Sequence, residues 1–232
     1  EDVGVTPGEP NSWYRFHTFG YADAIAEDDE ALASLGLITS HGFFNGTYHK
    51  MYFHDWRSAG TDILREQRPE LHAWTTSTTW RNMDAAMVEE MRNNIYAAKV
   101  NGLIPWAVIQ TDGDWIGGDP NPGTAFKVFE DGHYETWPAY AYYKQICRAG
   151  QPGMAVCQAL SNEHDIRLMA FARNGSKHPN AFVVINLADG ERSFDVKVRG
   201  NTSKRFAAYR TSPDEQYVSL GIFEASEDGC IA

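Results

Sequence analysis

Residues 71–115 constrain the fold most, because they read as strand, helix and strand in succession. Residues 71–75 form a short apolar run, and residues 103–109 form a longer one, typical of a parallel strand that is buried on both faces. Between them, Asn82 or Asp84 can cap a helix that Asn101 and Gly102 end. A helix between two such strands indicates a right-handed βαβ unit. Its apolar face is predicted from residues three or four apart: Met87, Met91, Ile95 and Ala98.

Polar and aromatic residues gather where each of these strands ends. Residues 74–77 (Trp-Thr-Thr-Ser) follow the first strand, and residues 110–115 (Gln-Thr-Asp-Gly-Asp-Trp) follow the second. In parallel α/β folds the carboxyl ends of the strands carry the functional site. The sequence therefore directs the search for function to this edge of the sheet.

The composition limits the classes of partner. The 232 residues carry a formal net charge of −11, which argues against nucleic acid or an anionic membrane surface as a partner. Hydrophobic residues make up 43% of the chain, but no apolar run reaches the length of a membrane span. Three cysteines do not make a disulfide framework, although Cys147 and Cys157 could pair across a turn-rich link.

The sequence pattern changes near residue 150. Before it, we expect a strand over residues 35–39 and helices over residues 58–67 and 136–147, in addition to the βαβ unit. We therefore predict an α/β domain over residues 1–150 and an antiparallel β-sandwich over residues 151–232. The strands of the sandwich are expected over residues 166–172, 181–187, 194–198, 204–210 and 216–223, with a hairpin turn at Asp189 and Gly190.

This order of elements resembles the C-terminal half of a clan A glycoside hydrolase, of glycoside hydrolase family 30 or the neighbouring family 39. The resemblance covers nearly the whole chain and rests on the order of the expected elements and on their residue patterns. It implies the last strands and helices of a (β/α)8 TIM barrel, followed by a β-sandwich. The strand that ends at residues 40–42 looks like the sixth of the barrel, residues 71–76 like the seventh, and residues 104–110 like the eighth.

The resemblance also implies a chemistry, namely retaining hydrolysis of a glycosidic bond by two glutamates about 5 Å apart. One glutamate, which acts as acid and base, follows the fourth strand of the barrel. We do not expect that strand in this chain. The nucleophile normally follows a Thr at the end of the seventh strand, where this chain has Thr75 and Thr76. Thr76 therefore stands at the nucleophile position without a carboxylate. Asn162 and Glu163 form the only Asn-Glu pair, and we interpret that pair as part of a turn.

Aromatic and polar residues near the strand ends are candidates for sugar binding. A single aromatic residue more often packs in a core or an interface, but together on one face these residues favour a sugar cleft. Three histidines and Asp55 fit no tight metal-ligand spacing, so we expect neither a metal nor a cofactor. The histidines are His41, His49 and His54. The sugar-binding candidates are His41, Trp56, Trp74, Trp106, Gln110 and Trp115.

Two function classes stay open. The first is part of a secreted, retaining glycoside hydrolase for a polysaccharide or oligosaccharide, in which a missing N-terminal barrel half or a second chain supplies the acid/base residue. The alternative is a non-catalytic carbohydrate-binding protein derived from such a hydrolase. Position 76 discriminates between them, because a threonine there favours the binding protein. Since the last strands alone cannot close a barrel, we expect about five further strands from elsewhere.

Overall fold

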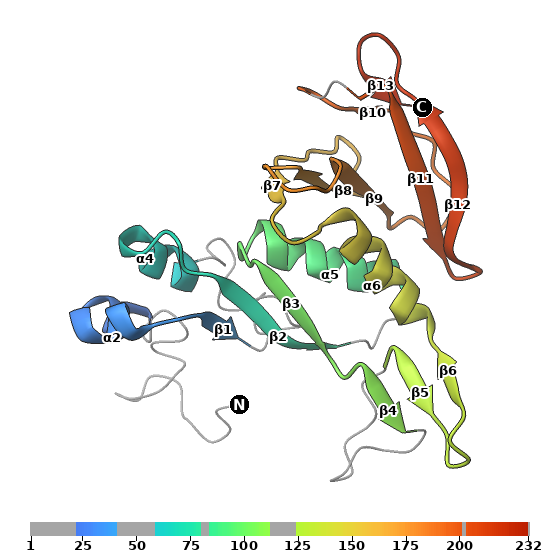
Figure 1. Ribbon diagram of the computed structural model, residues 1–232. Coiled ribbons are helices and arrows are strands. Elements are labelled where there is room, and N and C mark those ends of the chain that lie inside the picture. The colour runs from blue at the N-terminus through green and yellow to red at the C-terminus, as the bar shows by residue number, and fades with distance from the viewer. Residues whose placement is uncertain (1–21, 41–58, 80–83, 112–123, 201–202, 232) are drawn as a thin grey trace. The chain divides into compact units, whose positions relative to one another are not determined.

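The computed structural model describes residues 22–40, 59–79, 84–111, 124–200 and 203–231. These residues form a mixed α/β structure with several small sheets, as the sequence predicts at the level of fold class (Figure 1). The chain divides into two compact units. One comprises Glu1–Thr78 and Glu90–Trp106, and the other comprises Thr79–Glu89 and Ala107–Ala232. The division at residue 150 into a barrel part and a sandwich stays a prediction.

The first unit is built around a three-stranded sheet with the strand order β1-β2-β3. β1 and β2 pair in parallel, with Ile38 opposite Ala73 and Ser40 opposite Thr75. α5 connects β2 to β3, and the two strands run in the same direction (Figure 1). The predicted βαβ unit is therefore present. The elements are α2 (Asp29–Ser34), β1 (Ile38–Ser40), α4 (Ala59–Gln67), β2 (Ala73–Thr79), α5 (Ala85–Tyr96) and β3 (Gly102–Trp106).

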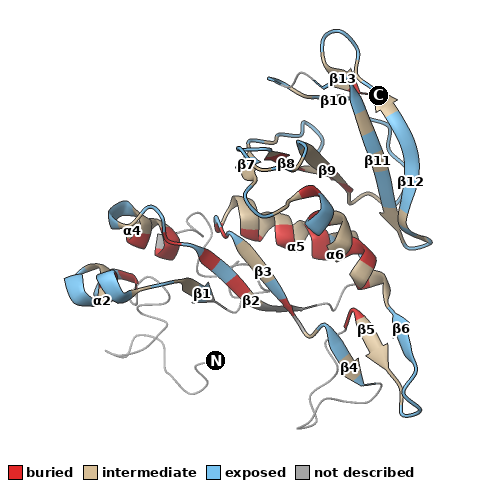
Figure 2. Cartoon of the chain, in the orientation of Figure 1, coloured by how far each residue is buried: buried red, intermediate tan, exposed pale blue. Residues whose placement is uncertain are grey.

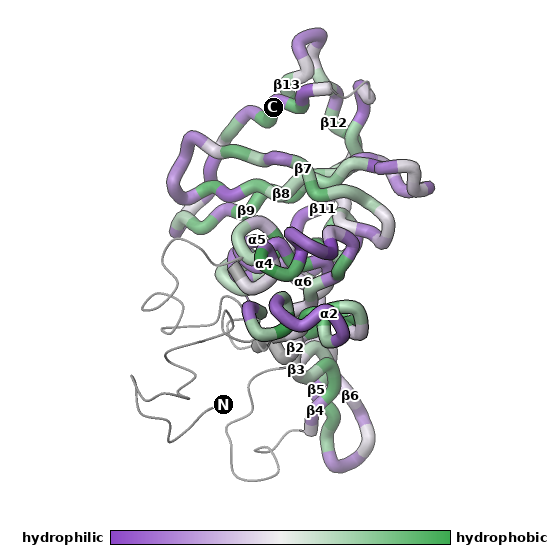
Figure 3. The backbone as a smooth tube through the Cα atoms, turned by 90° about the vertical axis from the view of Figure 1, so that its left-hand side faces the viewer, coloured by the Kyte–Doolittle hydropathy of each residue, from purple (hydrophilic) through white to green (hydrophobic). Residues whose placement is uncertain are grey.

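Aspartates fix the starts of two helices. The Asp28 carboxylate accepts hydrogen bonds of 3.0 Å from the backbone N–H groups of Glu30 and Ala31 and so caps α2. Figure 3 shows that α2 contains both hydrophilic and hydrophobic residues. Of the two candidate caps for α5, the structure selects Asp84, which accepts a hydrogen bond of 2.9 Å from the N–H of Ala86. Each cap of this kind contributes about 1 kcal/mol to helix stability.

The end of α5 differs from the prediction. The helix ends at Tyr96, and the left-handed backbone conformation belongs to Lys99, with φ 58°, rather than to Gly102. A neighbouring helix holds this loop, because the Arg65 guanidinium donates hydrogen bonds to the carbonyl of Lys99 at 2.7 Å and to Oδ1 of Asn101 at 2.5 Å. Tertiary contacts therefore support a conformation that the residue type by itself disfavours.

The core of the first unit lies on one side of the sheet. Around β2 and the end of α5, buried residues are packed against Ile38 and Leu103. A second cluster joins α2 and α4 to the chain before β2. Figure 2 shows the resulting alternation of buried and exposed residues along β2. The first cluster contains Ala73, Ala98 and Val100, and the second contains Ala22, Leu32, Leu64 and Leu71.

The apolar run predicted as one strand is divided between two sheets. β3 ends at Trp106, and β4 (Ile109–Thr111) belongs to the second unit, in a sheet with the order β4-β5-β6. The break comes at Val108, whose carbonyl accepts hydrogen bonds of 2.9 Å from the N–H of Phe126 and from the hydroxyl of Thr124. β4 then pairs in parallel with β5. The partners of Val108 lie more than a dozen residues away, so local sequence gave no sign of the break.

The second unit contains α6 and four small sheets, β4-β5-β6, β7-β8-β9, β10-β13 and β11-β12. α6 begins with Pro138 in its first turn, as predicted, because proline needs no hydrogen-bond partner there. Packing of these sheets as a sandwich stays a prediction. The remaining elements are β5 (Phe126–Val128), β6 (Tyr134–Thr136), α6 (Pro138–Ala149), β7 (Ala155–Cys157), β8 (Ile166–Ala172), β9 (Ala181–Asn186), β10 (Val196–Lys197), β11 (Arg205–Ser212), β12 (Glu215–Glu224) and β13 (Cys230–Ile231).

Several details of the second unit differ from the sequence predictions. The turn at Asp189 and Gly190 does not form a hairpin, because β10 pairs with β13 instead of β9. β5, β6, β7 and β13 were not predicted, since each is only two or three residues long. All three cysteines are free thiols, so the pairing of Cys147 with Cys157 that was left open does not occur in this structure.

Candidate functional site

Side-chain alternation along β2 separates the two faces of the parallel sheet. Thr75 is fully buried, and its hydroxyl donates a hydrogen bond of 3.0 Å to Oδ1 of the equally buried Asn94 in α5. Successive side chains of a strand point to opposite faces, so Trp74 and Thr76 point away from α5. We call this side the open face of the sheet. It comprises Trp74 and Thr76 of β2 with Gly102 and Ile104 of β3.

Trp74 dominates the open face. The residue is 37% exposed, and its indole lies so close to Gly102 that a methyl group there would come within 3.0 Å of the ring. Ile104 is 46% exposed on the same face, since Leu103 before it packs into the core. Parallel sheets normally have both faces covered, so an exposed indole and isoleucine mark the open face as an interaction surface.

Thr76 lies near the carboxyl end of the sheet. It is half-buried and follows Thr75, which pairs with Ser40, the last residue of β1. β2 itself continues to Thr79, three residues beyond Thr76, so the strand is longer than predicted. None of the residues in β1, β2 or β3 is an aspartate or glutamate. These strands therefore provide no carboxylate for nucleophilic attack.

Gln110 lies in β4 of the second unit, opposite Lys127 of β5. Its side-chain oxygen Oε1 is buried and has no hydrogen-bond partner among the described residues. A buried acceptor without a partner costs free energy, and a donor from a ligand would relieve that cost. Gln110 belongs to the second unit, whereas Trp74 and Thr76 belong to the first, so their grouping in one site stays a prediction.

The other predicted site residues are less informative. His41, Trp56 and Trp115 lie outside the described residues, as do His49, His54 and Asp55. Trp106 is the last residue of β3, and the structure does not describe its side chain. Within the described ranges, no group of three His, Cys, Asp or Glu side chains is arranged to hold a metal ion. Among the same residues, no helix has the length and apolarity needed to cross a membrane.

The glutamates that flank these strands or lie in other elements are not residues of β1, β2 or β3. Glu70 precedes β2 and pairs with Arg68 at 2.7 Å, which places it at the amino end of the strand, as the sequence indicated. Glu135 is an exposed residue of β6. Glu90 belongs to α5, and burial raises the pKa of its carboxyl group. Its Oε1 is buried without a hydrogen-bond partner in the described part of the chain.

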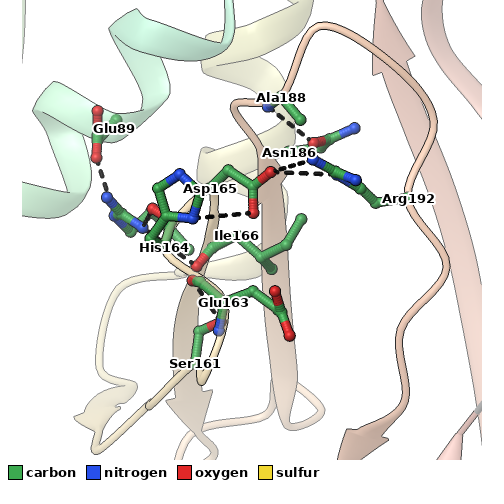
Figure 4. Close-up of polar contacts among 10 residues, drawn as sticks. Glu89, Ser161, Glu163, His164, Asp165, Ile166, Asn186, Ala188 and Arg192 are labelled. Carbon is green, nitrogen blue, oxygen red and sulfur yellow. Dashed lines mark hydrogen bonds and ion pairs between the residues drawn. The ribbon is translucent and has the colours of Figure 1, made fainter.

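The Asn-Glu pair of the sequence lies in a turn before β8, as expected, and Figure 4 shows Glu163 there. Glu163 is exposed, and its backbone N–H and carbonyl both bond to the hydroxyl of Ser161 at 3.1 Å. Beside this turn, Arg192 donates to Asp165 at 2.7 Å and Arg167 donates to Glu89 at 3.0 Å (Figure 4). The first ion pair joins the turn to the loop after β9, and the second joins β8 to α5, which supports a structural role for the turn.

Sequence reasoning missed Asn94, the residue that fixes the orientation of β2. Asn94 is fully buried in α5, and its amide nitrogen donates to the carbonyl of Glu90 at 3.0 Å. A signal was present, because Asn94 follows Met91 by three residues and so lies on the predicted apolar face. A polar residue on such a face predicts a buried hydrogen bond.

Comparisons with known proteins show similarity at the level of fold. The sequence matches no protein-family model and no curated protein. A GH30 endoxylanase from Clostridium papyrosolvens C71 has a similar structure, with a TM-score of 0.67 and 14% identity over 93% of this chain and 50% of that chain. The catalytic domain of GH30 xylanase C from Talaromyces cellulolyticus has a TM-score of 0.57 and 16% identity, over 90% of this chain and 45% of that one.

A third solved structure, SrfJ from Salmonella typhimurium, has a TM-score of 0.53 and 12% identity, over 72% of this chain and 37% of that chain. This chain therefore spans half or less of the length of each of the three structures. The similarity is to part of a GH30 fold.

Proposed function

We propose that this chain is part of a secreted, retaining glycoside hydrolase that acts on a polysaccharide or oligosaccharide. Its cleft lies at the carboxyl ends of β1, β2 and β3. The open face carries this proposal, because Trp74 is exposed there on a parallel sheet, on the same side as Thr76. The fold supports it, since two structures similar to this chain are described as a GH30 endoxylanase and a GH30 xylanase.

Sugar binding follows from the chemistry of the proposed cleft residues. The exposed indole of Trp74 offers an apolar face on which the C–H groups of a pyranose ring can stack. The indole lies directly against Gly102, and this contact limits the side-chain freedom that Trp74 would lose on binding. In the second unit, the buried Oε1 of Gln110 is an acceptor available to a sugar hydroxyl, and its membership of the same cleft is the prediction made from the sequence. His41, Trp56, Trp106 and Trp115 complete the proposed set.

Hydrolysis with retention needs a nucleophilic carboxylate and an acid/base carboxylate about 5 Å apart. In our proposal Thr76 occupies the nucleophile position, and its hydroxyl cannot replace a carboxylate without a base beside it. The acid/base residue comes from polypeptide beyond the described strands. The alternative function is a non-catalytic carbohydrate-binding protein, and it is favoured by the lack of any carboxylate in β1, β2 and β3.

Binding at the open face is tested by the Trp74→Ala variant. We expect the dissociation constant for soluble arabinoxylan, measured by affinity gel electrophoresis, to rise about fivefold or more, since stacking on an aromatic ring contributes about 1 kcal/mol. Tyr134→Ala is the matched control, because Tyr134 is an aromatic residue of β6 that is 66% exposed. Equal retardation of the wild type and Trp74→Ala would place sugar binding elsewhere.

We also propose that further polypeptide, either another segment or a second chain, supplies about five more strands, which enclose the open face and leave its carboxyl end accessible to the sugar. The full chain studied by itself is then expected to bind a hydrophobic dye and to unfold with low cooperativity. Ile104→Asn should reduce the dye fluorescence, whereas Ile109→Asn is the control, since Ile109 is also exposed but lies in β4. Cooperative unfolding of a monomer that binds no dye would overturn this expectation.

A further inference from the structure

Two tyrosines of the hairpin β11–β12 form an ordered stack beside α6. The rings of Tyr209 and Tyr217 are parallel to within 7°, with their centroids 4.6 Å apart. From α6, the Lys144 ammonium lies 4.8 Å from the centroid of Tyr217 and 5.9 Å from that of Tyr140. A cation over an aromatic face is attracted by the ring quadrupole, so Lys144 holds the Tyr217 ring in place.

A chain of hydrogen bonds fixes the backbone under this stack. The amide nitrogen of Gln145 donates to the carbonyl of Tyr209 at 2.9 Å, and the hydroxyl of Thr211 donates to Oε1 of Gln145 at 2.9 Å. The N–H of Tyr217 in turn donates to the Thr211 hydroxyl at 3.2 Å. These bonds tie both tyrosines to α6 through a single glutamine.

The backbone at Tyr217 is strained. Its φ is 56°, a left-handed conformation that a residue with a bulky side chain rarely adopts. The ladder between β11 and β12 is irregular here, with a register shift between Arg210 and Ser212. Strain of this kind persists only where the surroundings enforce it, and it is concentrated at sites that bind ligands. Here the strained backbone presents the Tyr217 ring to Tyr209.

Tyr209 presents a free surface to solvent. Tyr217 stacks on one face of the ring, and Tyr209 is still 43% exposed. A rigid aromatic face with polar groups around it matches a pyranose ring, whose C–H groups form an apolar face and whose hydroxyls lie at the edge. We propose that Tyr209 is the platform of a second carbohydrate-binding site that takes a polysaccharide chain of pyranose units.

This second site rests on the proposed function, because it assumes that the ligand of this protein is a polysaccharide. It is distinct from the open face, since every residue that forms it belongs to α6, β11 or β12. Its use would be to hold a polymer to the protein while another part of the same polymer occupies the cleft, which raises the effective concentration of the ligand.

Affinity gel electrophoresis of the full chain in soluble arabinoxylan tests this site. Tyr209→Ala is expected to raise the dissociation constant about fivefold or more, while Tyr209→Phe, which keeps the ring, leaves it near the wild-type value. Tyr217→Gly removes the supporting ring but suits the positive φ, so it should weaken binding while the backbone conformation of the hairpin is kept. Tyr134→Ala serves again as the exposed aromatic control.

The outcomes separate this inference from the proposed function. If Tyr209→Ala weakens retardation and Trp74→Ala does not, the second site stands and the proposed cleft fails. If only Trp74→Ala weakens it, the second site is overturned and the cleft stands. If the wild type is not retarded at all, both are overturned.

Discussion

Replacing Thr76 with glutamate is expected to raise the initial rate of dinitrophenol release from a dinitrophenyl β-xyloside by about 1000-fold or more over the wild type. Loss of a nucleophile costs several orders of magnitude in rate, so its restoration at the correct position has a comparable effect. The dinitrophenyl leaving group departs without protonation, so formation of the glycosyl adduct, which releases dinitrophenol, does not depend on the acid/base residue, whereas hydrolysis of the adduct by water does. The measurement is the release of dinitrophenol by the full chain.

Two controls and a chemical trap make the Thr76→Glu result specific. Thr75→Glu and Ser77→Glu place a carboxylate one residue before and after the site, and Thr75 points toward α5 rather than the open face. Both controls should stay at background. A fluorinated β-xyloside should label Thr76→Glu alone, which mass spectrometry detects as a covalent glycosyl adduct. A folded Thr76→Glu variant without turnover or adduct would refute the assignment of position 76.

The second large effect is expected for Arg65→Ala, which should lower the free energy of unfolding by about 2–3 kcal/mol. The Arg65 guanidinium donates to the carbonyl of Leu71 at 2.8 Å and to that of Lys99 at 2.7 Å, and it also binds Oδ1 of Asn101 at 2.5 Å. Partial burial lowers the pKa of Arg65. The charge of Asp62 raises it, but the effect of burial is larger. One side chain thus joins α4, the chain before β2 and the loop before β3.

Urea unfolding with two comparison variants measures the contribution of Arg65. Arg65→Lys keeps the charge but lacks the several N–H donors of the planar guanidinium. It should therefore recover only a minor part of the lost free energy of unfolding. Arg205→Ala removes an exposed arginine that pairs with Glu224 at 3.9 Å, and it should change stability by less than about 0.5 kcal/mol. If Arg65→Ala unfolds at the same urea concentration as Arg205→Ala, the bonds of Arg65 do not support the sheet.

Local patterns predicted several elements correctly. The spacing of Met87 and Met91 predicted α5, and both residues are buried. Pro138 marked the start of α6, and residues 166–172 form β8 as expected. These features depend on neighbours within one or two turns or along one strand, so the sequence carries them directly. The resemblance to a GH30 fold also followed from the order of such elements, and the similar solved structures support it at that level.

The structure was needed to orient β2. The sequence places Thr75, Thr76 and Ser77 next to one another, and a shift of one residue reverses which of them point to the open face. The hydrogen bond from Thr75 to Asn94 decides that register. It connects residues 19 apart in the chain, beyond the reach of a local pattern.

By itself, the sequence determined that the chain is a mixed α/β protein with a βαβ unit and a set of short antiparallel strands, because propensity, spacing and capping act over a few residues. Only the tertiary structure decided where the apolar run around Val108 breaks, which strand pairs with β10, and that Trp74 and Ile104 share an exposed face. The physical reason is that strand pairing and burial depend on partners distant in sequence, and those partners are chosen by packing.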